Sequence, residues 1–114
     1  MTHTDACKKV MLWLSEIGAR HVVVRQVGLF RDARGNHRAI GTKGEADVQA
    51  VMHGGRAVAV EVKMGRDDLR PEQKIWRANF ILQGGLYHVA RFRAGRSEES
   101  VKAEMVKALA PIAP

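Results

Sequence analysis

Two acids and a lysine stand on two neighbouring strand-like segments, and their spacing suits phosphodiester chemistry. Asp47 heads one segment, and Glu61 and Lys63 lie near the end of the other, residues 57–63. Side chains alternate between the faces of a strand, so Glu61 and Lys63 share one face while the valines take the other. Residues 53–56, His-Gly-Gly-Arg, predict a turn between the segments. If the segments pair as a hairpin, Asp47 lies beside Glu61.

Two carboxylates beside a lysine have the composition of a divalent-cation site. Mg²⁺ and Mn²⁺ take oxygen ligands, which Asp47 and Glu61 would supply as carboxylates and Val62 as a backbone carbonyl. A bound cation lowers the pKa of its water and offsets charge on phosphate oxygens. The Lys63 ammonium would orient the attacking water or neutralise the charge that develops.

The alternative is a solvated strand face on which Glu61 and Lys63 form a weak ion pair. Both residues, however, lie in a run that is otherwise apolar. Ionised groups in such a run need a partner or a metal. Gly44 and Gly65 bracket the segments and leave room for a close approach by backbone or ligand.

The remaining periodicity predicts an α/β fold in the order α-β-β-β-α-β-α, with a mixed sheet flanked by helices. Thr4 is the predicted N-cap of the first helix. The expected elements are, in chain order, a helix over 4–17, strands over 21–27, 47–52 and 57–63, a helix that begins at Pro71 and ends at Gln83-Gly84-Gly85, a strand over 86–92, and a helix marked by Val101, Met105, Val106 and Leu109.

A long basic segment over residues 28–44 holds four glycines and reads as a loop or a loose hairpin. The basic residues of this segment precede Asp47 in sequence, and two more basic residues follow the strand that carries Glu61 and Lys63. We expect these bases to contact the DNA backbone, which positions DNA without reading its sequence. They are Arg31, Arg34, Arg38, Lys43, Arg66 and Arg70. For Arg66 and Arg70 a solvated turn is an equal alternative.

Length and composition predict one small basic domain over residues 1–114. Apolar residues make up 46% of the chain and charged residues 27%, a balance typical of globular domains rather than disordered segments. The formal net charge is +7, which favours a polyanionic partner, nucleic acid first. A solvated basic surface is the alternative.

Some classes of protein are excluded. Cys7 is the single cysteine, so neither an intramolecular disulfide nor a cysteine-rich zinc site can form. No run approaches the ~20 apolar residues of a membrane span, and residues 1–9 lack a signal-peptide core. We therefore expect a soluble, cytoplasmic protein without membrane contact or organic cofactor; a phage-encoded origin is compatible.

Taken together, these motifs resemble the PD-(D/E)xK nuclease superfamily and, within it, the VRR-NUC family. The resemblance extends from about residue 5 to residue 92. It is carried by the Asp5 region of the first helix, Val24-Arg25-Gln26-Val27-Gly28, the basic Gly-rich segment, Lys43-Gly44-Glu45-Ala46-Asp47, Ala59-Val60-Glu61-Val62-Lys63, Pro71-Glu72-Gln73, and Gly84-Gly85-Leu86-Tyr87-His88-Val89.

The resemblance implies a restriction-endonuclease-like core with Asp47, Glu61 and Lys63 as catalytic residues. Gln73 matches the family glutamine that supports the site, and its spacing from the apolar residues of its helix predicts an inward-facing side chain. Asp5 matches an acid of the first helix that reaches the metal in the family, although glutamate is more usual there. Ala46 stands where the family usually has proline.

By the same resemblance the protein is a metal-dependent, structure-specific endonuclease that cleaves four-way (Holliday) junctions as a homodimer. Two sites are needed to cut both strands, and a C2 dimer supplies them. The alternatives are a flap or duplex nuclease subunit of a phage or defence system, an RNA nuclease, and a catalytically inactive nucleic-acid-binding module. Charge and motif do not separate DNA from RNA.

Overall fold

The computed structural model describes residues 1–25, 29–31, 33–34, 37–39 and 43–110, the second and fourth of these ranges by their backbone alone. The predicted order of helices and strands is confirmed, with one added pair of short strands. The elements are α1 (His3–Glu16), β1 (Arg20–Val24), β2 (Leu29–Arg31), β3 (His37–Ala39), β4 (Val48–Met52), a 3-10 turn (His53–Gly55), β5 (Arg56–Met64), α2 (Pro71–Leu82), β6 (Leu86–Phe92) and α3 (Glu98–Leu109).

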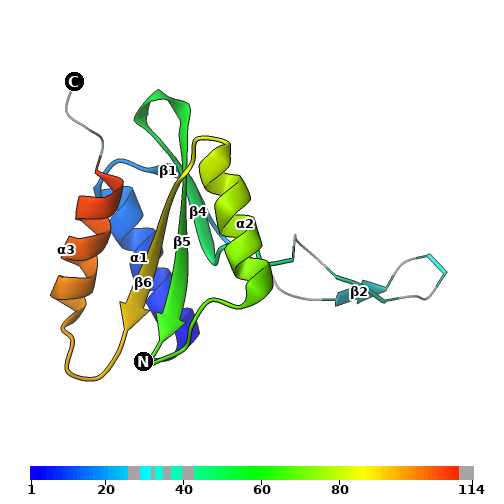
Figure 1. Ribbon diagram of the computed structural model, residues 1–114, viewed down its shortest axis with the longest axis horizontal. Helices are drawn as coiled ribbons and strands as arrows, with labels where there is room; N and C mark the ends of the chain where they lie inside the picture. The colour runs from blue at the N-terminus through cyan, green and yellow to red at the C-terminus, as the bar shows by residue number, and fades with distance from the viewer. Residues whose placement is uncertain (26–28, 32, 35–36, 40–42, 111–114) are drawn as a thin grey trace.

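A four-stranded mixed sheet forms the centre of the molecule, in the order β1-β4-β5-β6. β1, β4 and β5 pair antiparallel, whereas β6 runs parallel to β5. Parallel neighbours need a crossover connection, and α2 provides it. α1 and α3 cover one face of the sheet and α2 lies on the other (Figure 1). The structure therefore confirms the predicted mixed sheet flanked by helices.

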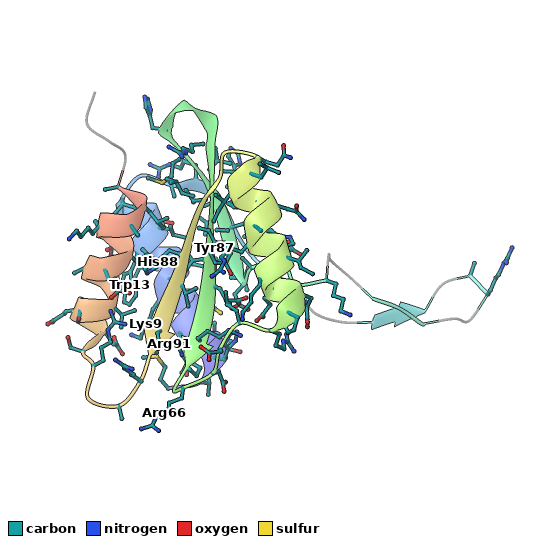
Figure 2. The ribbon with its side chains drawn as sticks, in the orientation of Figure 1. Lys9, Trp13, Arg66, Tyr87, His88 and Arg91 are labelled. Atoms are coloured by element: carbon teal, nitrogen blue, oxygen red, sulfur yellow. The ribbon has the colours of Figure 1, made fainter. Side chains whose placement is uncertain are left out.

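The core lies between the sheet and the pair α1 and α3. Alternate residues of β5 enter it, and Val58, Val60 and Val62 are buried there with Leu14 and Met105. Figure 2 shows the labelled Trp13 and His88 on this side of the sheet. The other residues of β5 point toward α2. The apolar alternation thus fixes which face of β5 presents its charged residues.

The N-cap of α1 lies two residues earlier than predicted. Thr2 is the N-cap: its hydroxyl accepts a hydrogen bond from the Asp5 backbone N–H at 3.1 Å, and the Asp5 carboxylate accepts one from the Thr2 N–H at 3.2 Å. This reciprocal capping box satisfies two helix donors, so the predicted cap at Thr4 is wrong. As a consequence His3 stands in the first turn of the helix.

β2 and β3 pair antiparallel as a separate two-stranded ribbon that projects from the main sheet (Figure 1). The ribbon occupies the segment that we expected to be a loop or a loose hairpin. The predicted strand over 21–27 ends at Val24, and residues 26–28 lie outside the described ranges. No helix in the described part of the chain is long and apolar enough to cross a membrane.

Candidate active site

The hairpin of β4 and β5 brings the two predicted acids together. Val48 pairs with Val60 and Ala50 with Val58, so the register places Asp47 opposite Glu61. The Val62 backbone N–H donates to Asp47 Oδ2 at 2.8 Å, which extends the pairing by a side-chain contact. The predicted proximity of Asp47 and Glu61 is therefore confirmed.

A cavity of about 350 Å³ opens where the termini of four elements meet. These are the start of β4, the end of β5, and the N-termini of α1 and α2. In Figure 1 these ends meet at one end of the sheet. All four residues predicted for the catalytic set line this cavity. The lining residues are His3, Arg25, Asp47, Glu61, Val62, Lys63, Met64, Asp67, Arg70 and Gln73.

Glu61 is a buried carboxylate without a partner for one of its oxygens. Its side chain is 1% exposed, and Oε2 accepts no hydrogen bond from the described residues. Burial raises the pKa of Glu61 to about 8, because it disfavours the charged form. The neighbouring Asp47 acts in the same direction, whereas Lys63 and Arg25 lower this pKa. A bound cation would satisfy the orphaned oxygen.

Lys63 is held by Gln73. Its ammonium donates to Gln73 Oε1 at 2.9 Å, and the same oxygen accepts from the Arg70 backbone N–H at 2.8 Å. Gln73 is 3% exposed, which confirms the predicted inward orientation. Arg70 is the N-cap of α2 and supplies no side-chain cap. The amide of Gln73 therefore helps to start α2 and at the same time orients the lysine.

Asp5 is not brought into the cavity. Its side chain is exposed and caps α1, and the hydrogen bonds with Thr2 lower the pKa of its carboxyl. α1 instead contributes His3, whose Nε2 lies 3.3 Å from Asp47 Oδ2 and 3.2 Å from the Val62 carbonyl oxygen. Sequence reasoning missed His3. The available signal was the four-residue spacing from Cys7, which places both side chains on the helix face toward the site.

Arg25 is a second residue that sequence reasoning did not assign to the site. Its backbone N–H donates to the Asp47 carbonyl at 2.6 Å, and its guanidinium donates to the Glu45 carbonyl at 3.3 Å. Arg25 Nε is buried and has no partner among the described residues. A positively charged donor is thus available to an anion that enters the cavity.

The bases predicted to contact DNA lie in two regions. Lys43, Arg66 and Arg70 are exposed on the main body, and Arg70 lines the cavity itself. The second region is the ribbon, where Arg31 lies in β2 and Arg38 in β3. Arg34 lies between these strands in sequence and is exposed, whereas the side chains of Arg31 and Arg38 lie outside the described part.

A further basic groove of about 690 Å³ lies beside the predicted Arg66 and was not predicted. It is lined by Gly65, Arg66, Arg93, Ala94, Gly95 and Arg96. Figure 2 shows Arg66 and Arg91 at the end of the sheet where β5 and β6 finish. The sequence signal was the run Arg91-Phe92-Arg93, followed closely by Arg96. Positive charge therefore surrounds the end of the sheet that holds the cavity.

Comparison with known proteins returns no relative of this chain: no family model, no curated protein and no solved structure matches it. The functional interpretation therefore depends on the geometry of the cavity and on the sequence motifs that line it.

Proposed function

We propose that the protein is a metal-dependent DNA endonuclease that hydrolyses phosphodiester bonds in the cavity at the start of β4 and the end of β5. The gathering of Asp47, Glu61, Lys63 and Gln73 in one cavity is the observation that carries the proposal. These residues come from the position before β4, from β5 and from α2, and two of them are almost fully buried. A solvated strand face, the alternative for Glu61 and Lys63, does not account for that burial.

The donor set fits a divalent cation such as Mg²⁺ or Mn²⁺. Asp47 and Glu61 would hold it with carboxylate oxygens, and Val62 with its backbone carbonyl. The observation that favours a cation is Glu61 Oε2, which has no hydrogen-bond donor among the residues that the structure describes; a buried carboxylate oxygen without a donor is costly. When bound, the cation would supply an activated water and offset negative charge on the phosphate.

The protein's own groups would position the phosphate and stabilise its charge. The Lys63 ammonium is fixed by Gln73 at 2.9 Å and faces the cavity that holds both acids. From there it would orient the attacking water or neutralise the developing oxyanion. Arg25 and Arg70 line the same cavity and would bind phosphate oxygens. Both arginines would position the DNA backbone without reading the nucleobases.

The substrate that we propose first is a four-way DNA junction, cleaved by a homodimer. It follows from the VRR-NUC resemblance and from the need for two sites to cut two strands. Large apolar side chains on α2 are available for self-association: Ile75 is 64% exposed and Leu82 79% exposed. Flap and duplex cleavage, RNA cleavage, and binding without turnover remain as outcomes that the experiment separates.

The test is cleavage of end-labelled substrates by purified protein with Mg²⁺, Mn²⁺ or EDTA. The panel holds a four-way junction, a flap, a plain duplex, a single strand and an RNA duplex. Lys63→Ala is compared with Lys102→Ala, a lysine on α3 that pairs with Glu16 at 2.6 Å and does not line the cavity. Metal-dependent paired nicks in the junction, lost in Lys63→Ala alone, are expected.

The other outcomes discriminate between the alternatives. Cutting of flap or duplex with the same dependence on metal and Lys63 would keep the chemistry and replace the junction. Cutting confined to RNA would replace DNA as the substrate. Binding without cutting in every metal would leave a nucleic-acid-binding module and remove the catalytic roles of Asp47, Glu61 and Lys63.

A further inference from the structure

We propose that the imidazole of His3 is a ligand of the cation in this cavity, which gives the site mixed nitrogen and oxygen donors and a preference for Mn²⁺ over Mg²⁺. The inference rests on the metal site of the proposed function. It adds a ligand from α1 that the motif of two acids and a lysine does not contain.

The position of His3 relative to two of the proposed ligand oxygens carries the inference. His3 Nε2 lies 3.3 Å from Asp47 Oδ2 and 3.2 Å from the Val62 carbonyl oxygen. Ligand atoms that bind one cation at about 2.1 Å in adjacent octahedral positions lie about 3 Å apart. The imidazole nitrogen therefore already stands, relative to each oxygen, close to the separation of neighbouring ligands of one ion.

The buried acid of β5 supplies the second observation. Glu61 lines the same cavity at 1% exposure, and its Oε2 has no partner within the described part of the chain. The nearby ammonium of Lys63 is already engaged by Gln73. A cation held by His3, Asp47 and the Val62 carbonyl would leave a coordination position for this oxygen. One ion would then satisfy donors from α1, β4 and β5.

An imidazole ligand has a chemical consequence for metal choice. Imidazole nitrogen favours transition metals, whereas Mg²⁺ prefers oxygen ligands and retains its waters. Cys7 lies near the same site, with Sγ 3.8 Å from His3 Nδ1. Cys7 is buried, however, and it is not one of the residues that line the cavity. The donor set is therefore nitrogen and oxygen rather than thiolate.

A hydrogen-bonding role is the competing explanation. An imidazole with its proton on Nε2 would donate to Asp47 and to the Val62 carbonyl and hold the end of the hairpin in place. His3→Gln separates the two roles, because glutamine retains an N–H donor but lacks the imidazole nitrogen. His3 is half exposed in the first helical turn, so this substitution is expected to preserve the fold.

The experiment measures the cation directly. Mn²⁺ bound to the protein is examined by electron spin-echo envelope modulation, where an imidazole ligand gives ¹⁴N coupling. We expect this coupling in wild type and in His53→Ala, an exposed histidine of the β4–β5 turn, and its loss in His3→Gln. By calorimetry the Kd for Mn²⁺ should rise about tenfold or more in His3→Gln, whereas the Kd for Mg²⁺ should change less than about threefold.

Three results would overturn the inference in different ways. Bound Mn²⁺ without ¹⁴N coupling, or with an unchanged Kd in His3→Gln, would remove His3 as a ligand and leave the metal site intact. Failure of Mn²⁺ to bind wild type, or binding that is unaffected by Asp47→Asn, would remove the metal site and the proposed function with it. A sulfur-to-metal charge-transfer band with Co²⁺ would assign the α1 ligand to Cys7 instead.

Discussion

A single amide oxygen of Gln73 serves two groups, the Lys63 ammonium and the Arg70 backbone N–H. Gln73→Ala removes both contacts and leaves the lysine free to leave the cavity. We expect the rate of DNA cleavage to fall about 10- to 100-fold, in the range typical of residues that orient a catalytic group. The Kd for DNA should change little, because Gln73 is buried. Single-turnover cleavage and equilibrium binding measure the two quantities separately.

Gln49→Ala is the matched control for this prediction. Gln49 is a half-buried glutamine of β4 whose amide donates to Glu45 at 2.6 Å, and it does not line the cavity. Its cleavage rate should stay within about threefold of wild type. Equal losses in both variants would show that any weakened amide in the sheet impairs cleavage, and Gln73 would lose its specific role.

The titration of His88 is expected to make the stability of the fold depend on pH. His88 lies on β6 with its side chain 11% exposed, and its Nε2 is 3.9 Å from Glu104 on α3. Burial lowers its pKa below the ordinary value of 6.5; Glu104 opposes this effect and Arg96 adds to it. The unfolded chain therefore binds a proton more readily than the folded one just below pH 6.5. The free energy of unfolding should fall as the pH drops through that window.

The His88→Gln variant tests this dependence. Urea unfolding of wild type and variant at pH 7.5, 6.5 and 5.5 is the measurement. The loss of stability between pH 7.5 and 5.5 should be smaller in His88→Gln, since the neutral side chain does not titrate. Identical pH profiles for the two proteins would exclude His88 as the source of the effect.

The residues of the site differ in how far sequence could predict them. Gln73 follows from its spacing to Trp76 and Phe80, which places it on the inward side of a helix with a clear Pro71 start. His3 does not follow in this way, because its role depends on where α1 begins. Thr2 and Thr4 are both acceptable caps, and the capping box with Asp5 decides between them only once the backbone is known.

At the level of elements, the hairpin of β4 and β5 was predictable and the ribbon of β2 and β3 was less so. In β5 valine recurs at every second position, at residues 58, 60 and 62, β4 alternates buried and less buried positions, and the turn between the strands holds two glycines. The ribbon strands have three residues each, too few for a periodic pattern to separate a strand from a loop. Only the glycines and bases of that segment were informative.

Gly44 predicts a close contact between two elements. Its φ is +81°, and a Cβ at this position would overlap the Glu72 backbone carbonyl at the start of α2. Gly44→Ala must therefore shift α2 or the turn before Asp47, in addition to the cost of a left-handed backbone. We expect it to lower the free energy of unfolding by about 2–4 kcal/mol, measured by urea denaturation, and to slow cleavage because the shift reaches Gln73.

Gly54→Ala supplies the control for backbone conformation alone. Gly54 has φ +82° in the turn between β4 and β5, and a Cβ there meets open space. Its substitution should cost only about 1 kcal/mol, the penalty for an L residue in the left-handed region, with normal cleavage. If the two substitutions cost the same, the contact of Gly44 with α2 would have no energetic weight.

On the scale of the whole molecule, five arginines lie around one end of the sheet. Arg66, Arg93 and Arg96 line a groove beside the cavity, and Arg25 and Arg70 line the cavity itself. If DNA lies across this end, affinity must fall steeply with salt. Charge reversal of Arg93, which is exposed in the groove, should weaken DNA binding and reduce the slope of log K against log salt by about 0.9 or more.

Arg20→Glu is the control for net charge. Arg20 lies on β1 opposite Val51, toward the end of the sheet away from Asp47. Its reversal changes the net charge by the same amount as Arg93→Glu. Fluorescence anisotropy at several salt concentrations should give a near wild-type slope for Arg20→Glu. Equal slopes in both variants would indicate that DNA responds to total charge and has no fixed path over this surface.

The distribution of the cavity residues along the chain sets the order in which the site can form during folding. Asp47 and Glu61 come together through a short hairpin and Lys63 meets Gln73 across 10 residues, whereas His3 reaches Asp47 across 44 residues. Contacts between distant segments are expected to form late. A chain in which the hairpin and α2 have already formed would therefore hold paired acids and an oriented lysine before His3 arrives. The proposed cation site would then be complete only after α1 has packed against the sheet, so its metal affinity should appear as the last step of folding.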